Sequence, residues 1–140
     1  MKTMKFFAVM CCAAMMLAFM SCSKDLEDAI VGSWKMVSET VTETYNGQSH
    51  SETEYPEEGD SVIYTFNEDN TYTEVIIYDG NDFTTTGTYS INGDKLTIHR
   101  EGDDEPNIST LEIDGNTMTI TYSESFGEET VMIVGKFKKI

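Results

Sequence analysis

The chain has 140 residues, of which 39% are hydrophobic and 11% aromatic, enough for one domain with a single core. Its formal net charge is −16, because 25 acidic residues outweigh nine basic ones. Such an acidic surface repels the phosphates of nucleic acids and the anionic head groups of lipids. We therefore expect no nucleic-acid partner, and any contact with a membrane must come from another feature of the chain.

The first 21 residues have the pattern of a signal peptide. Lys2 and Lys5 are followed by residues 6–20, an uncharged apolar run that is shorter than the roughly 20 residues of a membrane-spanning helix. The run ends at Ser21 and Cys22. This resembles a bacterial lipoprotein signal, in which the cysteine after a small residue is acylated, for example with palmitate, and becomes the mature N-terminus. Two alternatives stay open: a plain secretory leader with a free Cys22, and an uncleaved anchor.

A lipoprotein signal has consequences for the cysteines and for location. Cys11 and Cys12 would leave with the leader, so the mature chain would hold Cys22 alone, with no disulfide and no catalytic or metal-binding thiol. Loss of the two leader lysines would change the net charge to about −18. Residues 22–30 form an acidic tether that resembles those of surface-exposed lipoproteins in gut Bacteroidetes, or else an ordinary linker. We expect an outer-membrane lipoprotein of the bacterial cell envelope, either periplasmic or surface-exposed.

Residues 31–140 are predicted to form an all-β domain. Residues 25–31 come first and have the pattern of a single helical turn. Short alternating segments joined by Asn, Asp and Gly turns then follow at roughly ten-residue spacing. This pattern predicts an antiparallel up-and-down β-barrel of about eight strands, since closure removes the edges of a twisted sheet. The expected strands are residues 33–45, 48–55, 61–66, 71–78, 82–91, 95–100, 108–113, 117–123 and 130–137.

Two local features are expected within this series. Residues 48–55 contain almost no apolar side chain, which indicates an edge strand or a protruding, solvated hairpin. Gly87 interrupts another strand, where an isolated glycine suggests a bulge or a bend.

Short motifs at both ends of the domain carry a family resemblance. The first strand opens with Gly32-Ser33-Trp34, and the last ends with Lys136-Phe137-Lys138-Lys139. With Tyr64-Thr65-Phe66-Asn67 and Gly87-Thr88-Tyr89-Ser90-Ile91 between them, the chain resembles the lipocalin-like (calycin) lipoproteins of Bacteroidetes over residues 30–140. The Thr-Asp-Tyr triplet of larger lipocalins and the helical lid of fatty-acid-binding proteins are missing.

The resemblance implies a role for Trp34. In such barrels a Gly-X-Trp motif, here Gly32 to Trp34, opens the first strand, the tryptophan packs across the closed end, and a basic residue of the last strand often covers its ring. By position, that cation–π partner would be Lys136 or Lys138. The alternative is that Trp34 is an ordinary core residue of a β-sandwich.

The sequence lacks recognisable catalytic and metal-binding motifs. His50 and His99 have no partner at metal-ligand spacing, and the nucleophile elbow, Walker loop and zinc-helix motifs are missing. The acidic loops 57–60 and 101–105 lack the residue order of a calcium loop and are expected to be solvated. We expect no catalytic residue, no metal, no cofactor and no enzymatic activity.

Three functional hypotheses follow. The favoured one is a lipid-anchored barrel that binds a small hydrophobic or amphipathic ligand, with ligand-binding residues that the sequence does not identify. The alternative is a structural or protein-interaction module of an envelope complex, with a filled barrel and contacts through hairpin 46–55 and the acidic loops. An enzyme or an enzyme inhibitor is the third and is disfavoured.

Overall fold

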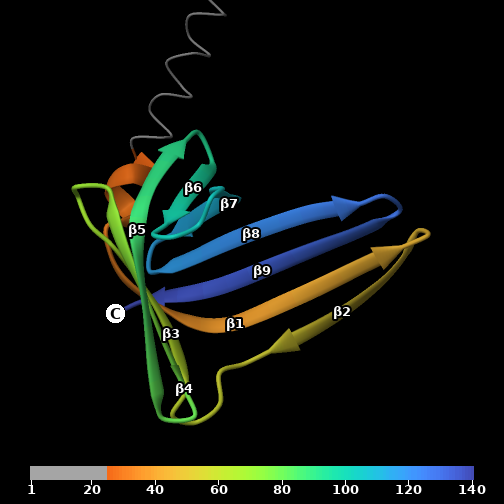
Figure 1. Ribbon diagram of the computed structural model, residues 1–140, viewed down its shortest axis with the longest axis horizontal. Helices are drawn as coiled ribbons and strands as arrows, with labels where there is room; N and C mark the ends of the chain where they lie inside the picture. The colour runs from red at the N-terminus through yellow and green to blue at the C-terminus, as the bar shows by residue number, and fades with distance from the viewer. Residues whose placement is uncertain (1–24) are drawn as a thin grey trace, which may run out of the picture.

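A short helix and nine antiparallel strands make up the computed structural model, which describes residues 25–140 (Figure 1). The helix covers residues 25–30. The strands are β1 (Gly32–Tyr45), β2 (Gln48–Glu54), β3 (Ser61–Phe66), β4 (Thr71–Tyr78), β5 (Asn81–Asn92), β6 (Lys95–Arg100), β7 (Asn107–Asp114), β8 (Thr117–Phe126) and β9 (Glu129–Lys139). The predicted all-β fold with a short N-terminal helix is confirmed. The leader and Cys22 lie outside the described residues.

Eight of these strands close into a barrel. The order is β1-β3-β4-β5-β6-β7-β8-β9, and β9 pairs with β1 again. Each neighbour in this order is antiparallel to the next, as expected for sequential hairpins. The ninth strand, β2, lies outside the closed ring and pairs only with β1 among the described strands.

The long strand β1 explains why the barrel is closed at one end and open at the other. Along one edge it pairs with β3 over residues 32–35 and then with β2 over residues 39–45. Its other edge pairs with β9 along nearly its whole length. Strand β3 therefore separates from β1 after Lys35, and the two sides of the barrel diverge. Figure 1 shows β8, β9, β1 and β2 running together to one side while β3, β4 and β5 run in another direction.

We call the four-stranded extension the wing: residues 39–54 of β1 and β2 and residues 122–135 of β8 and β9. Strand β7 pairs with β8 only up to Thr121, so both outer edges of the wing lack a neighbouring strand among residues 25–140. Strand β2 is exposed along its whole length, which confirms the predicted solvated hairpin. Hydroxyl pairs on one face, such as Thr42–Ser51 at 2.8 Å, join β1 to β2.

The hydrophobic core fills the closed end. It contains the fully buried Trp34 and residues from most strands of the ring. Tyr64 and Phe137 stack with centroids 5.0 Å apart, and Phe66 meets Tyr89 edge-on at the same distance. The buried hydrophobic residues are Ile30, Trp34, Phe66, Tyr72, Tyr89, Ile91, Leu96, Ile98, Leu111, Met118 and Phe137.

A β-bulge in β1 changes which residues face the interior. The pairing of β1 with β9 shifts between Met36 and Ser38, so that Met36 lies opposite Phe137 and Glu39 lies opposite Gly135. An extra residue in one strand reverses the alternation of side chains beyond it. Met36 and Glu39 consequently face the same interior, although their spacing of three would place them on opposite faces of a regular strand.

Of the two alternatives predicted at Gly87, a bulge or a bend, the bulge is not present. The register runs unbroken from Tyr72 through Gly87 to Arg100 across β4, β5 and β6. A Cβ atom at Gly87 would lie 2.0 Å from the His99 carbonyl oxygen and 2.7 Å from Tyr72 Cε1. Glycine is required here because two neighbouring strands crowd this position, and not because the strand is interrupted.

Candidate functional site

The closed end of the barrel is built around Trp34. Its ring is completely buried, and its indole Nε1 donates a hydrogen bond of 2.7 Å to the Ile30 carbonyl oxygen. Ile30 is also completely buried, so the helix 25–30 caps this end of the barrel. A buried tryptophan needs a partner for its N–H group, and the chain just ahead of the first strand supplies it.

The basic residue that covers this ring is Lys139, so the assignment to Lys136 or Lys138 is wrong. Lys139 Nζ lies 5.0 Å from the ring centroid. Lys136 and Lys138 both flank the buried Phe137 and are exposed. Side chains alternate along a strand, so Lys139 shares the inner face with Phe137 and its two lysine neighbours do not.

Gly32 makes room for this lysine. Its φ angle of +127° is one that L side chains rarely adopt, and a Cβ atom there would lie 2.9 Å from Lys139 Cε. Lys139 Nζ also donates to the Ala29 carbonyl oxygen at 3.2 Å. Gly32, Trp34 and Lys139 therefore form one structural unit, which holds the last strand against the helix and the first strand.

An ion pair between a buried carboxylate and a partly exposed arginine lies further up the barrel interior. The Glu74 side chain is 7% exposed, and its Oε2 lies 3.2 Å from Arg100 Nη2. Glu74 faces inward between apolar neighbours of β4, and Arg100 faces inward at the end of β6. An interior carboxylate needs such a partner because the desolvation of an isolated charge is very costly. Neither residue belongs to a motif that the sequence would single out.

Two tyrosines lie close to the pair. Burial raises the pKa of Tyr64 above its ordinary value of 10.0, and the negative charge of Glu74 raises it further. Burial also raises the pKa of Tyr72, against the opposing effect of the Arg100 guanidinium. Burial opposes the charge of Arg100 and is the largest single effect, but Glu74, Tyr72 and Tyr64 together outweigh it, so the pKa of Arg100 is raised. Both phenols are therefore neutral at physiological pH.

Above the closed end, the barrel interior holds a cavity of about 300 Å³. This volume is at the lower end of the range for ligand pockets, so the cavity suits a small molecule. Strands β1, β3, β6, β7, β8 and β9 all contribute to it. Its lining is largely apolar and aromatic, with a few polar groups: Met36, Glu39, Tyr64, Ile98, Arg100, Asn107, Ser109, Ile120, Tyr122, Ile133, Gly135 and Phe137.

Two polar groups in this lining have no partner among the described residues. Ser109 is 4% exposed, and its hydroxyl makes no hydrogen bond. The side chain of the half-buried Glu39 forms no hydrogen bond or ion pair within residues 25–140. Buried polar groups are nearly always hydrogen-bonded, so the Ser109 hydroxyl marks a place where a ligand could donate or accept a hydrogen bond.

The mouth of the barrel adds a second, adjoining pocket of about 520 Å³. It shares Met36 and Glu39 with the interior cavity, so the two spaces meet at these residues. Glu54, Tyr55 and Glu57 line its wing side. On the other side the lining comes from β3 and β4, through Val62, Ile76, Ile77 and Tyr78.

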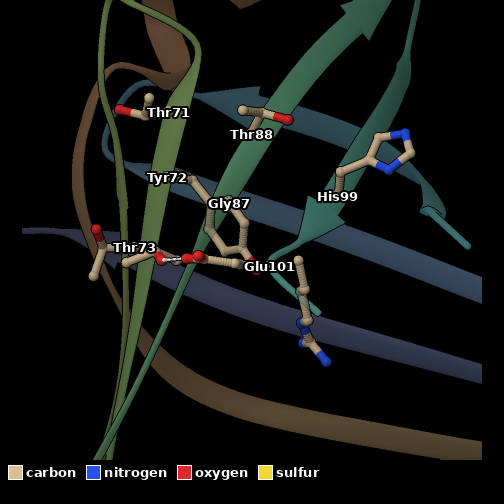
Figure 2. A pocket seen from close by; sticks show the side chains of 9 residues that line it. Thr71, Tyr72, Thr73, Gly87, Thr88, His99 and Glu101 are labelled. Carbon is tan, nitrogen blue, oxygen red and sulfur yellow. Dashed lines mark hydrogen bonds between the residues drawn. The ribbon is translucent and has the colours of Figure 1, made fainter. Parts of the chain in front are cut away.

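A separate cleft of about 510 Å³ lies where β4, β5 and β6 meet. Figure 2 shows the Tyr72 ring beside Gly87, with His99 turned away on β6. Thr71, Thr73 and Thr88 supply hydroxyl groups, and Glu101 accepts a 2.7 Å hydrogen bond from Thr86. Apart from the buried Tyr72 ring, Gly87 and the Arg100 side chain, its lining consists of threonine, histidine and glutamate side chains.

The two histidines lie apart from the interior cavity. His50 is exposed on β2, and His99 faces outward on β6, where it lines the cleft between β4, β5 and β6. Within residues 25–140, no three His, Cys, Asp or Glu side chains are placed to hold a metal ion together. No helix in this part of the chain is long and apolar enough to cross a membrane.

Sequence comparison gives one match. A model of the lipocalin-like domain family matches residues 30–120, which span the helix end, the Gly-Ser-Trp motif and the strands up to β8. No curated protein and no solved structure matches the chain.

Proposed function

Since this chain belongs to the lipocalin-like domain family, we propose that it binds a small hydrophobic or amphipathic molecule in the open end of its barrel. The observation that carries the proposal is the interior cavity, with its apolar walls and its unpartnered Ser109 hydroxyl. Ligand pockets are typically apolar with a few convergent polar groups. Lipocalin-like domains are generally binding folds, so we propose a binding role without catalysis.

We further propose that the protein is a lipoprotein of the bacterial cell envelope, anchored through acyl chains on Cys22. The helix 25–30, which packs against Trp34, joins the barrel at its closed end. An anchor that precedes this helix would attach the barrel by that end. The cavity mouth would then face away from the membrane and stay accessible to solutes or to partner proteins.

Binding can be tested with the neutral fluorescent probe N-phenyl-1-naphthylamine, whose emission rises in apolar surroundings. We expect saturable binding by the wild-type protein. The variant Ile133→Trp, which fills the cavity, should lower the affinity more than tenfold, equivalent to about 1.4 kcal/mol. Met132→Trp is the matched control, because Met132 is the adjacent residue and faces the opposite side of β9.

The results separate the alternatives. Equal binding by Ile133→Trp and wild type would place the probe outside the cavity. Failure of the wild-type protein to bind this and other apolar probes would contradict the proposed function and favour a filled barrel.

A second candidate function rests on the wing. Strand β2 is exposed throughout, and its outer edge has no pairing strand among the described residues, so it could accept a strand from a partner protein. This would suit an interaction module of an envelope complex. A photocrosslinker at Ser51 should then capture a distinct partner in isolated membranes, whereas one at exposed Glu112 on β7 should not.

A further inference from the structure

The charges around the cavity mouth bear on which small molecule it accepts. Residues that lie directly opposite each other on neighbouring strands share a face. Glu39 lines the cavity, and the registers place Glu54, Glu43 and Glu124 on the same face of the wing. Glu52 and Glu129 complete this acidic face. The basic residue that the registers place on the same face is His50, opposite Glu43.

Glu39 and Glu54 form an unfavourable pair in the described structure. They lie directly opposite each other on β1 and β2, and both line the mouth pocket. Like charges at directly opposed positions destabilise a sheet. Arg100 is the one basic residue in the lining of the interior cavity, and it is already paired with Glu74. A bound cation would relieve this repulsion.

The adjoining cavity supplies an independent indication of a ligand. The Ser109 hydroxyl is buried and unpartnered, and it lines the same space as Glu39. The walls between them include Met36, Ile120 and Phe137, which suit a hydrocarbon chain. The site therefore combines an apolar interior, a hydroxyl group that can donate or accept, and an acidic entrance.

We propose that the natural ligand is a cationic amphipath, with an apolar chain inside the barrel and a protonated amine at Glu39 and Glu54. This inference rests on the proposed ligand-binding function and specifies the charge of the ligand. A protonated amine can pair with both carboxylates and still donate to a neutral acceptor. An anionic amphipath, such as a fatty acid, would instead meet repulsion at the entrance.

Three probes with the same chain length isolate the effect of head-group charge: octylammonium, 1-octanol and octanoate. Calorimetric titrations at pH 7 and low salt should give octylammonium an affinity about tenfold above that of octanol, and octanoate the weakest binding. Glu39→Gln should remove most of the preference for octylammonium over octanol. Glu43→Gln is the matched control, since Glu43 is on the same strand and face but is exposed and does not line the cavity.

Backbone NMR shifts show where the probe binds. Octylammonium should shift the amide signals of Ser109 and Ile120, which line the interior cavity. Shifts confined to β2 would mean adsorption to the acidic surface and would overturn the inference. Equal affinity for all three probes, or a preference for octanoate, would overturn it while the proposed binding function stands. Failure of all three to bind would count against the binding function itself.

Discussion

Lys139 Nζ lies 5.0 Å from the centroid of the Trp34 ring and donates a hydrogen bond to the Ala29 carbonyl oxygen at 3.2 Å. One side chain at the end of the last strand thus contacts both the first strand and the helix ahead of it. Gly32 leaves space for the lysine stem. Contacts between residues more than 100 positions apart in the chain therefore stabilise the closed end.

This contact predicts an unequal effect of two adjacent lysines. Lys139→Ala should lower the free energy of unfolding by about 1 kcal/mol, through loss of the cation–π contact and of packing by the lysine stem. Lys138→Ala, on the outer face, should change it by less than about 0.5 kcal/mol. Urea unfolding of the two variants measures the difference. Equal effects would contradict the assignment of Lys139.

Trp34 should contribute strongly to stability. Because its ring is fully buried, Trp34→Ala should cost about 3–5 kcal/mol of unfolding free energy, which can be measured by urea denaturation. Trp34→Phe retains part of the packing but loses the hydrogen bond to Ile30, so its cost should be smaller. A loss below about 1 kcal/mol for the alanine variant would be incompatible with a buried ring.

The ion pair between Glu74 and Arg100 predicts non-additive effects. Arg100→Leu leaves the buried Glu74 carboxylate without its partner and should cost roughly 2–4 kcal/mol, less than for a fully buried pair because Arg100 is partly exposed. The double variant Arg100→Leu/Glu74→Leu should recover much of this loss, since no uncompensated charge remains. Thermal and urea unfolding of both single variants and the double variant measure the coupling. Simple addition of the two single losses would show that the residues act independently.

Tyr64 predicts a loss of stability at alkaline pH. Its pKa is raised above 10.0 by burial and by Glu74, so the folded state holds this proton more tightly than the unfolded state does. The stabilisation is complete below about pH 10 and is lost as the pH rises toward the pKa of the folded state. Tyr64→Phe keeps the ring packed on Phe137. It should make the unfolding free energy fall less steeply with pH in the alkaline range, by an amount that corresponds to about one bound proton. Unfolding free energies from pH 7 to 11 test this, and an unchanged slope would exclude Tyr64 as a source.

The proposed anchor predicts that Cys22→Ala moves the protein from the membrane fraction to the soluble fraction. The physical reason is that several acyl chains on one residue give stable membrane attachment, and the substitution removes the acceptor for all of them. Fractionation followed by mass spectrometry of the N-terminal peptide provides the measurement. Ser23→Ala is the matched control, because it changes the adjacent residue and leaves Cys22 in place. Membrane retention by Cys22→Ala would require another anchor.

Sequence patterns alone determined the strand series and much of its inside–outside alternation. In β8, for example, Met118, Ile120 and Tyr122 alternate with threonines and therefore share a face, and all three belong to the barrel interior. Local alternation suffices there because apolar and polar residues repeat with the two-residue period of a strand. The same period, counted from Phe137, would have indicated Lys139 as the inner lysine. The family resemblance instead suggested Lys136 or Lys138.

The candidate site depended on tertiary structure. The register shift beside Val37 turns Glu39 into the cavity, and it is defined only by pairing with β9. Glu74 lies in a strand where apolar residues occur on both faces, so alternation could not show that the carboxylate faces inward. Its partner Arg100 is two strands away in the barrel. The sequence determined which segments form strands because that choice is local, whereas strand pairing and closure decided which polar groups meet inside the barrel.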